Sequence, residues 1–215
     1  MFFEFADING DGLLDLVVAS TRWVKVGFNT GHYPRFNGSW KILFTGDVHS
    51  NMEFAVGNFS KVTGPHVVLV DNGKLIYLRN SGRNEEEWEQ HTIDKDSHYC
   101  VSIDLCQRIK VFIADYDSDG DEDIILSEVF GSDLWYYENR DGNGDFAPRR
   151  SILSARRING VAFGDMDGDG RIDLVADTIN SYRSPVILAW YHNGASVSVH
   201  EMRSGISEQL FLTLL

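Results

Sequence analysis

Short runs of consecutive apolar residues recur along the chain, and each follows a polar loop. The runs are Leu16–Val18, Val67–Val70, Ile124–Leu126 and Leu174–Val175. A half-buried strand alternates apolar and polar side chains, whereas a strand buried on both faces is apolar at every position. The pattern therefore predicts four short strands, each with both faces covered by protein.

The residues before these runs repeat as well, which makes an internal repeat the first property to define. The segment Phe5 to Gly12 returns as Ile113 to Gly120 and as Phe163 to Gly170, with a weaker copy at Val56 to Ser60. The first polar positions of the copies are spaced by 51, 57 and 50 residues, at Asp7, Asn58, Asp115 and Asp165. A β-rich segment later in each unit ends at an asparagine, namely Asn29, Asn80, Asn139 and Asn193. Each unit is therefore predicted to contain about four strands separated by turns.

A repeat of about fifty residues, with four strands and two covered faces, is typical of a propeller blade. We therefore predict an all-β fold, a β-propeller of four-stranded antiparallel blades, with about four blades in one domain over residues 1–215. The blades are expected at approximately 1–50, 51–105, 106–156 and 157–215. An ordinary β-sandwich would instead show alternating strands and no period of this length.

The formal charge of −13 is concentrated in three loops. Twelve aspartates lie there, and without them the formal charge would be about −1. No basic stripe is present, so nucleic acid is not an expected partner. No apolar run approaches the roughly 18 residues of a membrane helix, and the first residues do not form a secretion signal, so neither a membrane span nor a targeting address is expected in this chain.

The three acidic loops share the pattern Asp-x-Asp/Asn-x-Asp-Gly-x-x-Asp. Side chains at positions 1, 3 and 5 of a tight loop can converge on one point, position 7 can offer its backbone carbonyl, and position 9 closes the site. Glycine at position 6 permits the sharp turn. The predicted ligands are Asp7, Asn9, Asp11, Leu13 and Asp15 in the first loop, Asp115, Asp117, Asp119, Asp121 and Asp123 in the second, and Asp165, Asp167, Asp169, Arg171 and Asp173 in the third.

These oxygen-rich loops favour Ca²⁺, at about three sites, with Mg²⁺ as a weaker competitor because it tolerates crowded cages poorly. Zinc and copper are disfavoured, since no nitrogen or sulfur ligand is present. An EF-hand would need a glutamate at position 12, where this chain has Val18, Leu126 and Ala176. The alternative of plain polar turns explains one loop, but three copies at the same phase of a repeat favour metal binding.

The weak copy serves as an internal control. Its positions 1, 3, 5 and 9 are Asn58, Ser60, Val62 and His66. It keeps the apolar strand that follows and lacks the carboxylates. We expect this loop to bind no metal.

The chain resembles the FG-GAP and VCBS repeat family. The resemblance lies in the loops and strands Ala6 to Val18, Ala114 to Leu126 and Phe163 to Val175, and in the stretch Tyr137 to Phe146. It covers nearly the whole chain. It implies the propeller fold of integrin α-chain heads, usually with seven blades and with Ca²⁺ in the blade loops.

Four units fall short of the seven blades that the resemblance implies. The chain is therefore expected to be part of a larger propeller, unless it closes as a four-blade ring or pairs with a second copy. An open end would expose the face of a blade and favour self-association.

The expected function is that of a calcium-binding structural and interaction module with a protein or glycan partner. Such loops are often fully loaded only at extracellular calcium, which points to an extracellular or cell-surface location. The alternative is the propeller of a carbohydrate-active enzyme, a polysaccharide lyase or sugar dehydratase, although no known catalytic motif is present. Cys100 and Cys106 could form a short-range bridge or remain two buried thiols.

Overall fold

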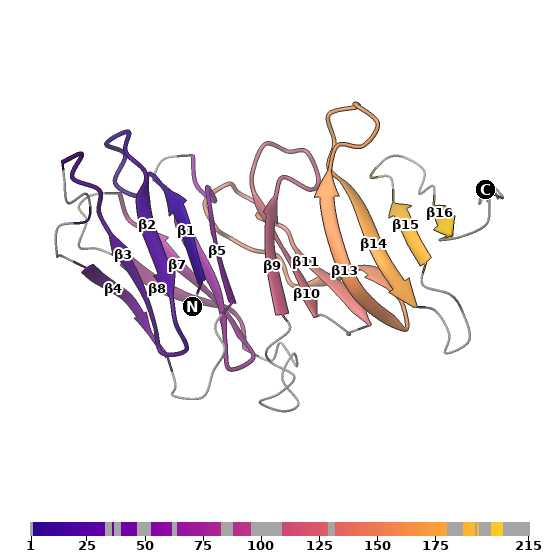
Figure 1. The fold of residues 1–215 in the computed structure, drawn as a ribbon, viewed down its shortest axis with the longest axis horizontal. Coiled ribbons are helices and arrows are strands. Elements are labelled where there is room, and N and C mark those ends of the chain that lie inside the picture. Colours follow the sequence, from indigo (N-terminus) through magenta and orange to yellow (C-terminus); the bar gives the residue numbers. More distant parts are fainter. Residues whose placement is uncertain are drawn as a thin grey trace.

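The computed structural model describes residues 2–32, 36, 40–46, 53–61, 64–82, 88–95, 109–128, 132–179, 187–191, 193 and 199–203. These residues form sixteen strands in four sheets of four strands, and every pairing is antiparallel. Each sheet is a meander of four strands consecutive in the chain, as Figure 1 shows. The predicted all-β fold of four-stranded blades is confirmed. Cys100 and Cys106 lie outside the described residues.

We number the sheets as blades in chain order. Blade 1 contains β1 (Phe2–Ala6), β2 (Asp15–Ala19), β3 (Trp23–Gly27) and β4 (Trp40–Thr45). Blade 2 contains β5 (Glu53–Gly57), β6 (His66–Asp71), β7 (Lys74–Asn80) and β8 (Trp88–Asp94). Blade 3 contains β9 (Ile109–Ala114), β10 (Asp123–Glu128), β11 (Asp133–Tyr137) and β12 (Arg150–Ser154). Blade 4 contains β13 (Arg157–Gly164), β14 (Asp173–Ile179), β15 (Ile187–Tyr191) and β16 (Val199–Arg203).

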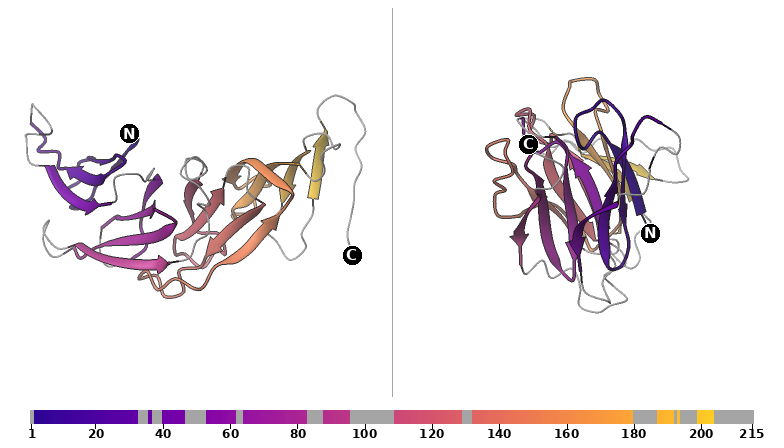
Figure 2. Two further views of the ribbon diagram at one scale, coloured as in Figure 1. Left: turned by 90° about the horizontal axis from the view of Figure 1, so that it is seen from below. Right: turned by 90° about the vertical axis from the view of Figure 1, so that its left-hand side faces the viewer.

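The blades follow one another along an open arc. β5 contacts the first strands of both neighbouring blades, β1 and β9, and β13 of blade 4 contacts β10 of blade 3. Figure 2 shows blade 1 and blade 4 at opposite ends of the arc. The described residues therefore do not close into a four-blade ring.

Three apolar cores fill the three spaces between the four blades. Val17 and Val26 of blade 1 pack with Val67 and Leu78 of blade 2 in the first core. The second core joins blades 2 and 3, and the third joins blades 3 and 4. All six residues of β6 are buried, because alternate side chains enter the first and the second core. The continuous apolar run thus reflects burial on both faces, as the sequence pattern predicted.

Blade 1 departs from that prediction on one side. Its inner face packs on blade 2, but no blade covers its other face among the described residues. Leu16 in β2 is accordingly only half-buried, and Phe5 in β1 is exposed. The run Leu16–Val18 indicated a strand covered on both faces, whereas the position at the end of the arc leaves one face without a neighbouring blade.

Candidate metal centres

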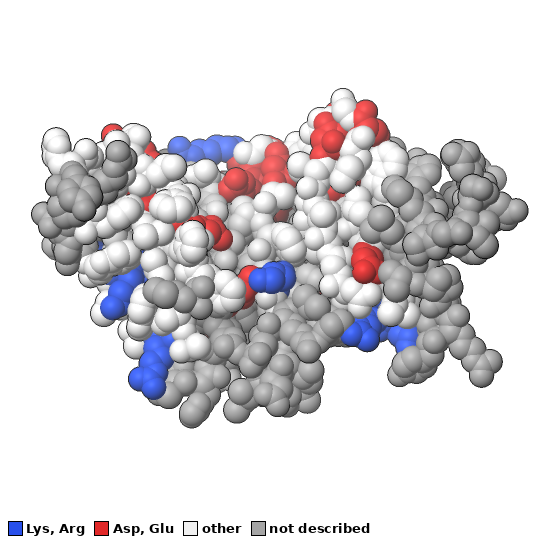
Figure 3. Space-filling view, in the orientation of Figure 1, with Lys and Arg blue, Asp and Glu red and all other residues white. Residues whose placement is uncertain are grey.

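The three acidic loops occupy the same place in three blades. Each connects the first strand to the second, in blades 1, 3 and 4, and the loops lie along one edge of the arc (Figure 1). Acidic side chains accordingly gather along that edge in the space-filling view of Figure 3.

Among the described residues, no helix is both long and apolar enough to cross a membrane.

The carboxylate at position 1 folds each loop around itself. Asp115 accepts hydrogen bonds from the backbone N–H of Asp119 at 3.0 Å and of Gly120 at 3.1 Å. Asp7 and Asp165 accept the corresponding bonds in the other two loops. The glycine at position 6 has a positive φ in all three loops, at 83°, 93° and 86° for Gly12, Gly120 and Gly170. The shared sequence pattern therefore produces one shared loop conformation.

Two of the loops bring three carboxylates together. The oxygens of Asp115, Asp117 and Asp119 lie within 4.8 Å of one another, and so do those of Asp165, Asp167 and Asp173. Ligands on opposite sides of a Ca²⁺ ion, each about 2.4 Å from it, are separated by about 4.8 Å. The donor sets contain only oxygen, so both sets fit a hard divalent cation.

The loop of blade 1 does not form such a group among the described residues. Asn9 occupies position 3, where the other loops carry Asp117 and Asp167. The Asn9 amide donates to the Asp11 carboxylate at 3.1 Å. Asp7, Asn9 and Asp11 share the loop fold of the other two sites with one carboxylate fewer at the first three ligand positions.

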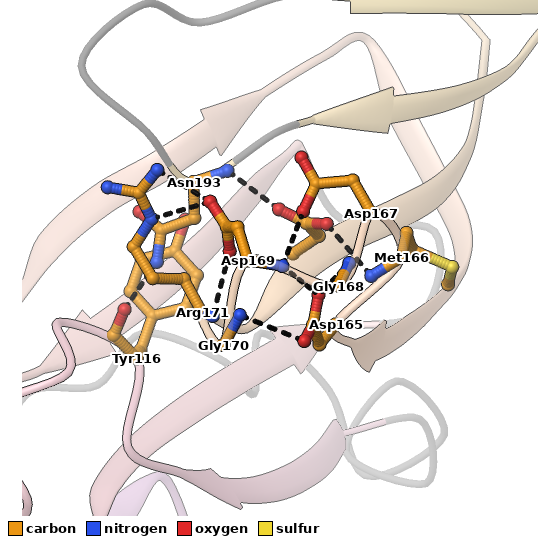
Figure 4. A network of polar contacts seen from close by, with 10 residues as sticks. Tyr116, Asp165, Met166, Asp167, Gly168, Asp169, Gly170, Arg171 and Asn193 are labelled. Atoms are coloured by element: carbon orange, nitrogen blue, oxygen red, sulfur yellow. Dashed lines mark hydrogen bonds and ion pairs between the residues drawn. The ribbon is translucent and has the colours of Figure 1, made fainter.

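Two basic side chains bind acids of the loops. Arg171 holds Asp169 through its Nε at 2.9 Å and its Nη2 at 2.6 Å, as Figure 4 shows, and the grouped carboxylates of blade 4 do not include Asp169. Lys61, from the loop of blade 2, lies 2.7 Å from the carboxylate of Asp121 in blade 3. Neither contact was predicted from the sequence, which assigned only the backbone carbonyls of Asp121 and Arg171 to the metal.

The aspartate at position 9 is a structural acceptor in each loop. Asp123 is fully buried, and its carboxylate accepts the N–H of Tyr116 at 3.0 Å, the N–H of Asn139 at 2.8 Å and the hydroxyl of Tyr136 at 2.9 Å. Burial raises the pKa of Asp123 to about 6. Asp15 and Asp173 are also fully buried and accept the two equivalent backbone bonds. These carboxylates clamp the start of the loop to the end of the third strand, a role that the sequence did not reveal.

In blade 2 the contact with the end of the third strand is made without a carboxylate. His66 takes position 9 and is fully buried, and its Nδ1 accepts the N–H of Asn80 at 3.1 Å and the hydroxyl of Tyr77 at 3.0 Å. Burial lowers the pKa of His66 to about 4, which keeps the ring neutral and its Nδ1 lone pair available at neutral pH. In the described part of this loop, no group of three acids forms around Asn58 and Ser60. Val62 lies outside the described residues.

The repeated asparagine joins neighbouring blades. The side-chain amide of Asn80 donates to the Ile8 carbonyl of blade 1 at 2.8 Å, and that of Asn139 donates to the Phe59 carbonyl of blade 2 at 3.1 Å. Asn193 donates in the same way to the Tyr116 carbonyl of blade 3 (Figure 4). Each acceptor is position 2 of the preceding blade's loop. The recurrence of asparagine was visible in the sequence, but its acceptor lies in another repeat.

The comparisons with known proteins agree with this architecture. A family model described as FG-GAP-like repeat matches residues 115–176. A search of curated proteins found no match. One similar solved structure is described as the recognition of non-reducing terminal N-acetylglucosamine by a lectin of Agrocybe aegerita. The two structures superpose with a TM-score of 0.64 and 19% sequence identity, and the match covers 91% of this chain and 50% of the lectin chain.

A second solved structure, the V. cholerae biofilm matrix protein Bap1, has a TM-score of 0.49 and 15% identity over 91% of this chain and 27% of its own. This chain therefore spans half the length of the lectin and about a quarter of Bap1. The likeness to the lectin concerns the fold. Residues 115–176 of this chain form an FG-GAP-like repeat, within an array of four propeller blades.

Proposed function

We propose that the chain is a calcium-binding array of propeller blades that serves as a structural and interaction module. The observation that carries this proposal is the occurrence of two groups of three carboxylate oxygens, each within 4.8 Å, in the same loop of two blades. Carboxylates at these separations repel one another in the absence of a cation. A divalent ion would remove that repulsion and fix the loop.

The residues of the two groups would hold the ions. In blade 3 these are Asp115, Asp117 and Asp119 with the backbone carbonyl of Asp121, and in blade 4 they are Asp165, Asp167 and Asp173 with the carbonyl of Arg171. The remaining lone pairs of Asp123, and the carboxylate of Asp169 once released from Arg171, would complete the two sites. Asp7, Asn9, Asp11, Asp15 and the carbonyl of Leu13 would form a third, weaker site in blade 1. Each ion would stabilise the fold by about 2.7 kcal/mol at a free concentration one hundred times its dissociation constant.

Calorimetric titration of the chelator-treated chain tests this proposal. We expect two strong Ca²⁺ sites and one weaker site, weaker binding of Mg²⁺, and a melting temperature that rises with added Ca²⁺. Asp115→Asn and Asp165→Asn should each remove one strong site, whereas Asn58→Ala in the loop of blade 2 should remove none. An unchanged stoichiometry in both aspartate variants, or a melt insensitive to a chelator, would contradict the proposal.

For the partner, we favour a glycan over a protein. The support is the likeness of the fold to a lectin whose title names terminal N-acetylglucosamine as its ligand. We further propose an extracellular or cell-surface location. Calcium is high enough there to fill even weak sites, with dissociation constants of about 10⁻⁴–10⁻³ M.

A glycan array that includes terminal N-acetylglucosamine, probed with and without a chelator, tests the choice of partner. Binding that weakens with the chelator is the expected result. Absence of binding to every glycan would reject the glycan and leave a protein partner. Release of unsaturated sugar products would indicate a lyase and overturn the proposal of a non-catalytic module.

A further inference from the structure

The outward face of blade 1 is an exposed apolar sheet surface. Phe3 and Phe5 of β1 are 65% and 54% exposed and lie on the side away from blade 2. Antiparallel pairing places the buried Val18 and the half-buried Leu16 of β2 beside them. The same face continues across Lys25 and Gly27 of β3 to Ile42 and Trp40 of β4, which are 55% and 41% exposed. We call these residues the outward face of blade 1.

The other three blades show what such a face receives. The residues at the positions of Phe3 and Phe5 pack in the core that each blade shares with the blade before it; they are Phe54 and Val56, Val111 and Ile113, and Val161 and Phe163. The positions of Leu16 and Val18 are filled in blade 3 by Ile124 and Leu126, which are fully buried against blade 2. The outward face of blade 1 therefore has the composition of a surface that packs on a preceding blade.

A polar contact of the repeat is also half made at this face. Asn139 donates both to the Glu122 carbonyl of its own blade at 3.2 Å and to the Phe59 carbonyl of the preceding blade. Asn29 makes the contact within its own blade, to the Leu14 carbonyl at 3.1 Å. Among the described residues no blade precedes it, so the second amide hydrogen of Asn29 has no carbonyl of a neighbouring loop to meet.

Blade 4 presents the complementary half at the other end of the arc. The equivalent acceptor for Asn29 is the backbone carbonyl of Met166, at position 2 of the blade 4 loop. Met166 is 51% exposed. Val175 and Trp190 pair across β14 and β15 on the side away from blade 3. The position of Trp190 corresponds to that of Tyr136 in blade 3, which is fully buried against blade 4. The two ends of one chain thus carry both halves of a blade contact.

We propose that the outward face of blade 1 binds the outward side of blade 4 of a second copy of this chain. The contact would reproduce the three internal ones, with Phe3 and Phe5 packed on Val175 and Trp190 of the other copy. Asn29 would donate to the Met166 carbonyl of the other copy. Because the contact is heterologous, two arcs that make it twice would form a closed dimer, and arcs whose curvature does not close would form longer assemblies.

Sedimentation equilibrium of the full chain tests this contact. We expect concentration-dependent association of the unmodified chain. Phe5→Glu should weaken it by at least about tenfold, because the new carboxylate would be buried in an apolar contact without a partner. Ala162→Glu, at an exposed position that pairs with Val175 on the outward side of blade 4, should weaken it similarly. The matched control is Phe2→Glu, on the same strand beside Lys110 of blade 3, which should associate normally.

Mixing the two variants distinguishes a head-to-tail contact from a symmetric one. Phe5→Glu keeps an intact blade 4 end and Ala162→Glu keeps an intact blade 1 end, so the mixture should associate more strongly than either variant alone. Normal association of Ala162→Glu alone would indicate contact between two blade 1 faces and overturn the proposal. A monomer at every concentration would also overturn it and leave further blades of a longer polypeptide as the occupant. Thermal melts of each variant check that the fold is intact.

Discussion

In blade 3 the buried Asp123 accepts hydrogen bonds from the Asn139 N–H and the Tyr136 hydroxyl, and in blade 2 His66 accepts from the Asn80 N–H and the Tyr77 hydroxyl. Both acceptors hold the end of the third strand, although one is a carboxylate and the other a neutral imidazole. Blade 2 keeps these two contacts while lacking the carboxylates at positions 1, 3 and 5. The comparison therefore separates two roles within one loop: position 9 supports the blade, and the earlier positions gather negative charge.

The largest expected effect comes from removing the clamp of blade 3. Asp123→Ala leaves the N–H groups of Tyr116 and Asn139 without their acceptor, whereas the Tyr136 hydroxyl keeps the Asp117 carboxylate at 3.0 Å. We expect a loss of about 3–5 kcal/mol in the free energy of unfolding, because buried donors lose their partner. Urea denaturation in the presence of a chelator measures this loss without any contribution from metal. A comparable loss in the exposed Asp117→Ala variant under the same conditions would contradict the separation of roles.

The second prediction uses pH to distinguish the two acceptors. His66 has a folded pKa of about 4 against an ordinary value of 6.5, so the unfolded state binds more protons between these values. The stability contributed by neutral His66 is therefore complete above pH 6.5 and is lost as the pH falls towards 4, by on the order of 3 kcal/mol.

His66→Asp supplies the acceptor that blade 3 uses, and it should remove this loss. Burial raises the pKa of Asp123, whose contribution changes with pH in the opposite direction but is common to both proteins. Urea melts at pH 7 and pH 5 provide the measurement, with the difference between the proteins as the readout. Parallel pH profiles would show that His66 is not the group responsible.

The third prediction concerns the loss of one proposed Ca²⁺ ligand. Asp119→Ala should cost about 2–3 kcal/mol when free Ca²⁺ is one hundred times its dissociation constant, and far less in a chelator. Asn58→Ala changes position 1 of the blade 2 loop, which carries no carboxylate, and its effect on stability should not depend on Ca²⁺. Differential scanning calorimetry of both variants in the two conditions makes the comparison. An equal Ca²⁺ response in the parent and in Asp119→Ala would exclude position 5 of blade 3 as a ligand.

The smallest expected effect lies at the contact between the two loops. Lys61 of blade 2 pairs with Asp121 of blade 3, and this pairing raises the pKa of Lys61, to which the nearby Asp119 and Asp115 also contribute. Lys61→Met removes a positive charge close to the proposed site, so Ca²⁺ affinity in blade 3 should rise a few-fold. Stability without Ca²⁺ should change little, because the lysine is mostly exposed. Titration calorimetry with Lys74→Met as the control detects the difference, and lower affinity would contradict the prediction.

The sequence was sufficient for the blades because their signal is periodic. Apolar runs such as Ile124–Leu126 and the phase of the acidic loops depend on local order alone, and the structure contains the predicted four-stranded sheets. The pairing of Lys61 with Asp121 depends instead on how two blades pack, and the residues are sixty positions apart. The clamp role of Asp173 was hidden for another reason, since a buried carboxylate that accepts N–H groups and a metal ligand share one side chain and one position.

The hydrogen bonds of Ile8 extend the effect of each loop beyond its own blade. Its N–H is held by Asp15 and its carbonyl by Asn80 of the next blade, while its neighbour Asp7 takes the first position of the acidic loop. The same arrangement recurs at Tyr116, whose N–H donates to Asp123 and whose carbonyl accepts from Asn193 of the next blade. An ion bound beside such a residue would slow hydrogen exchange in the following blade as well as in its own. Metal binding to one loop would therefore also stabilise the neighbouring blade.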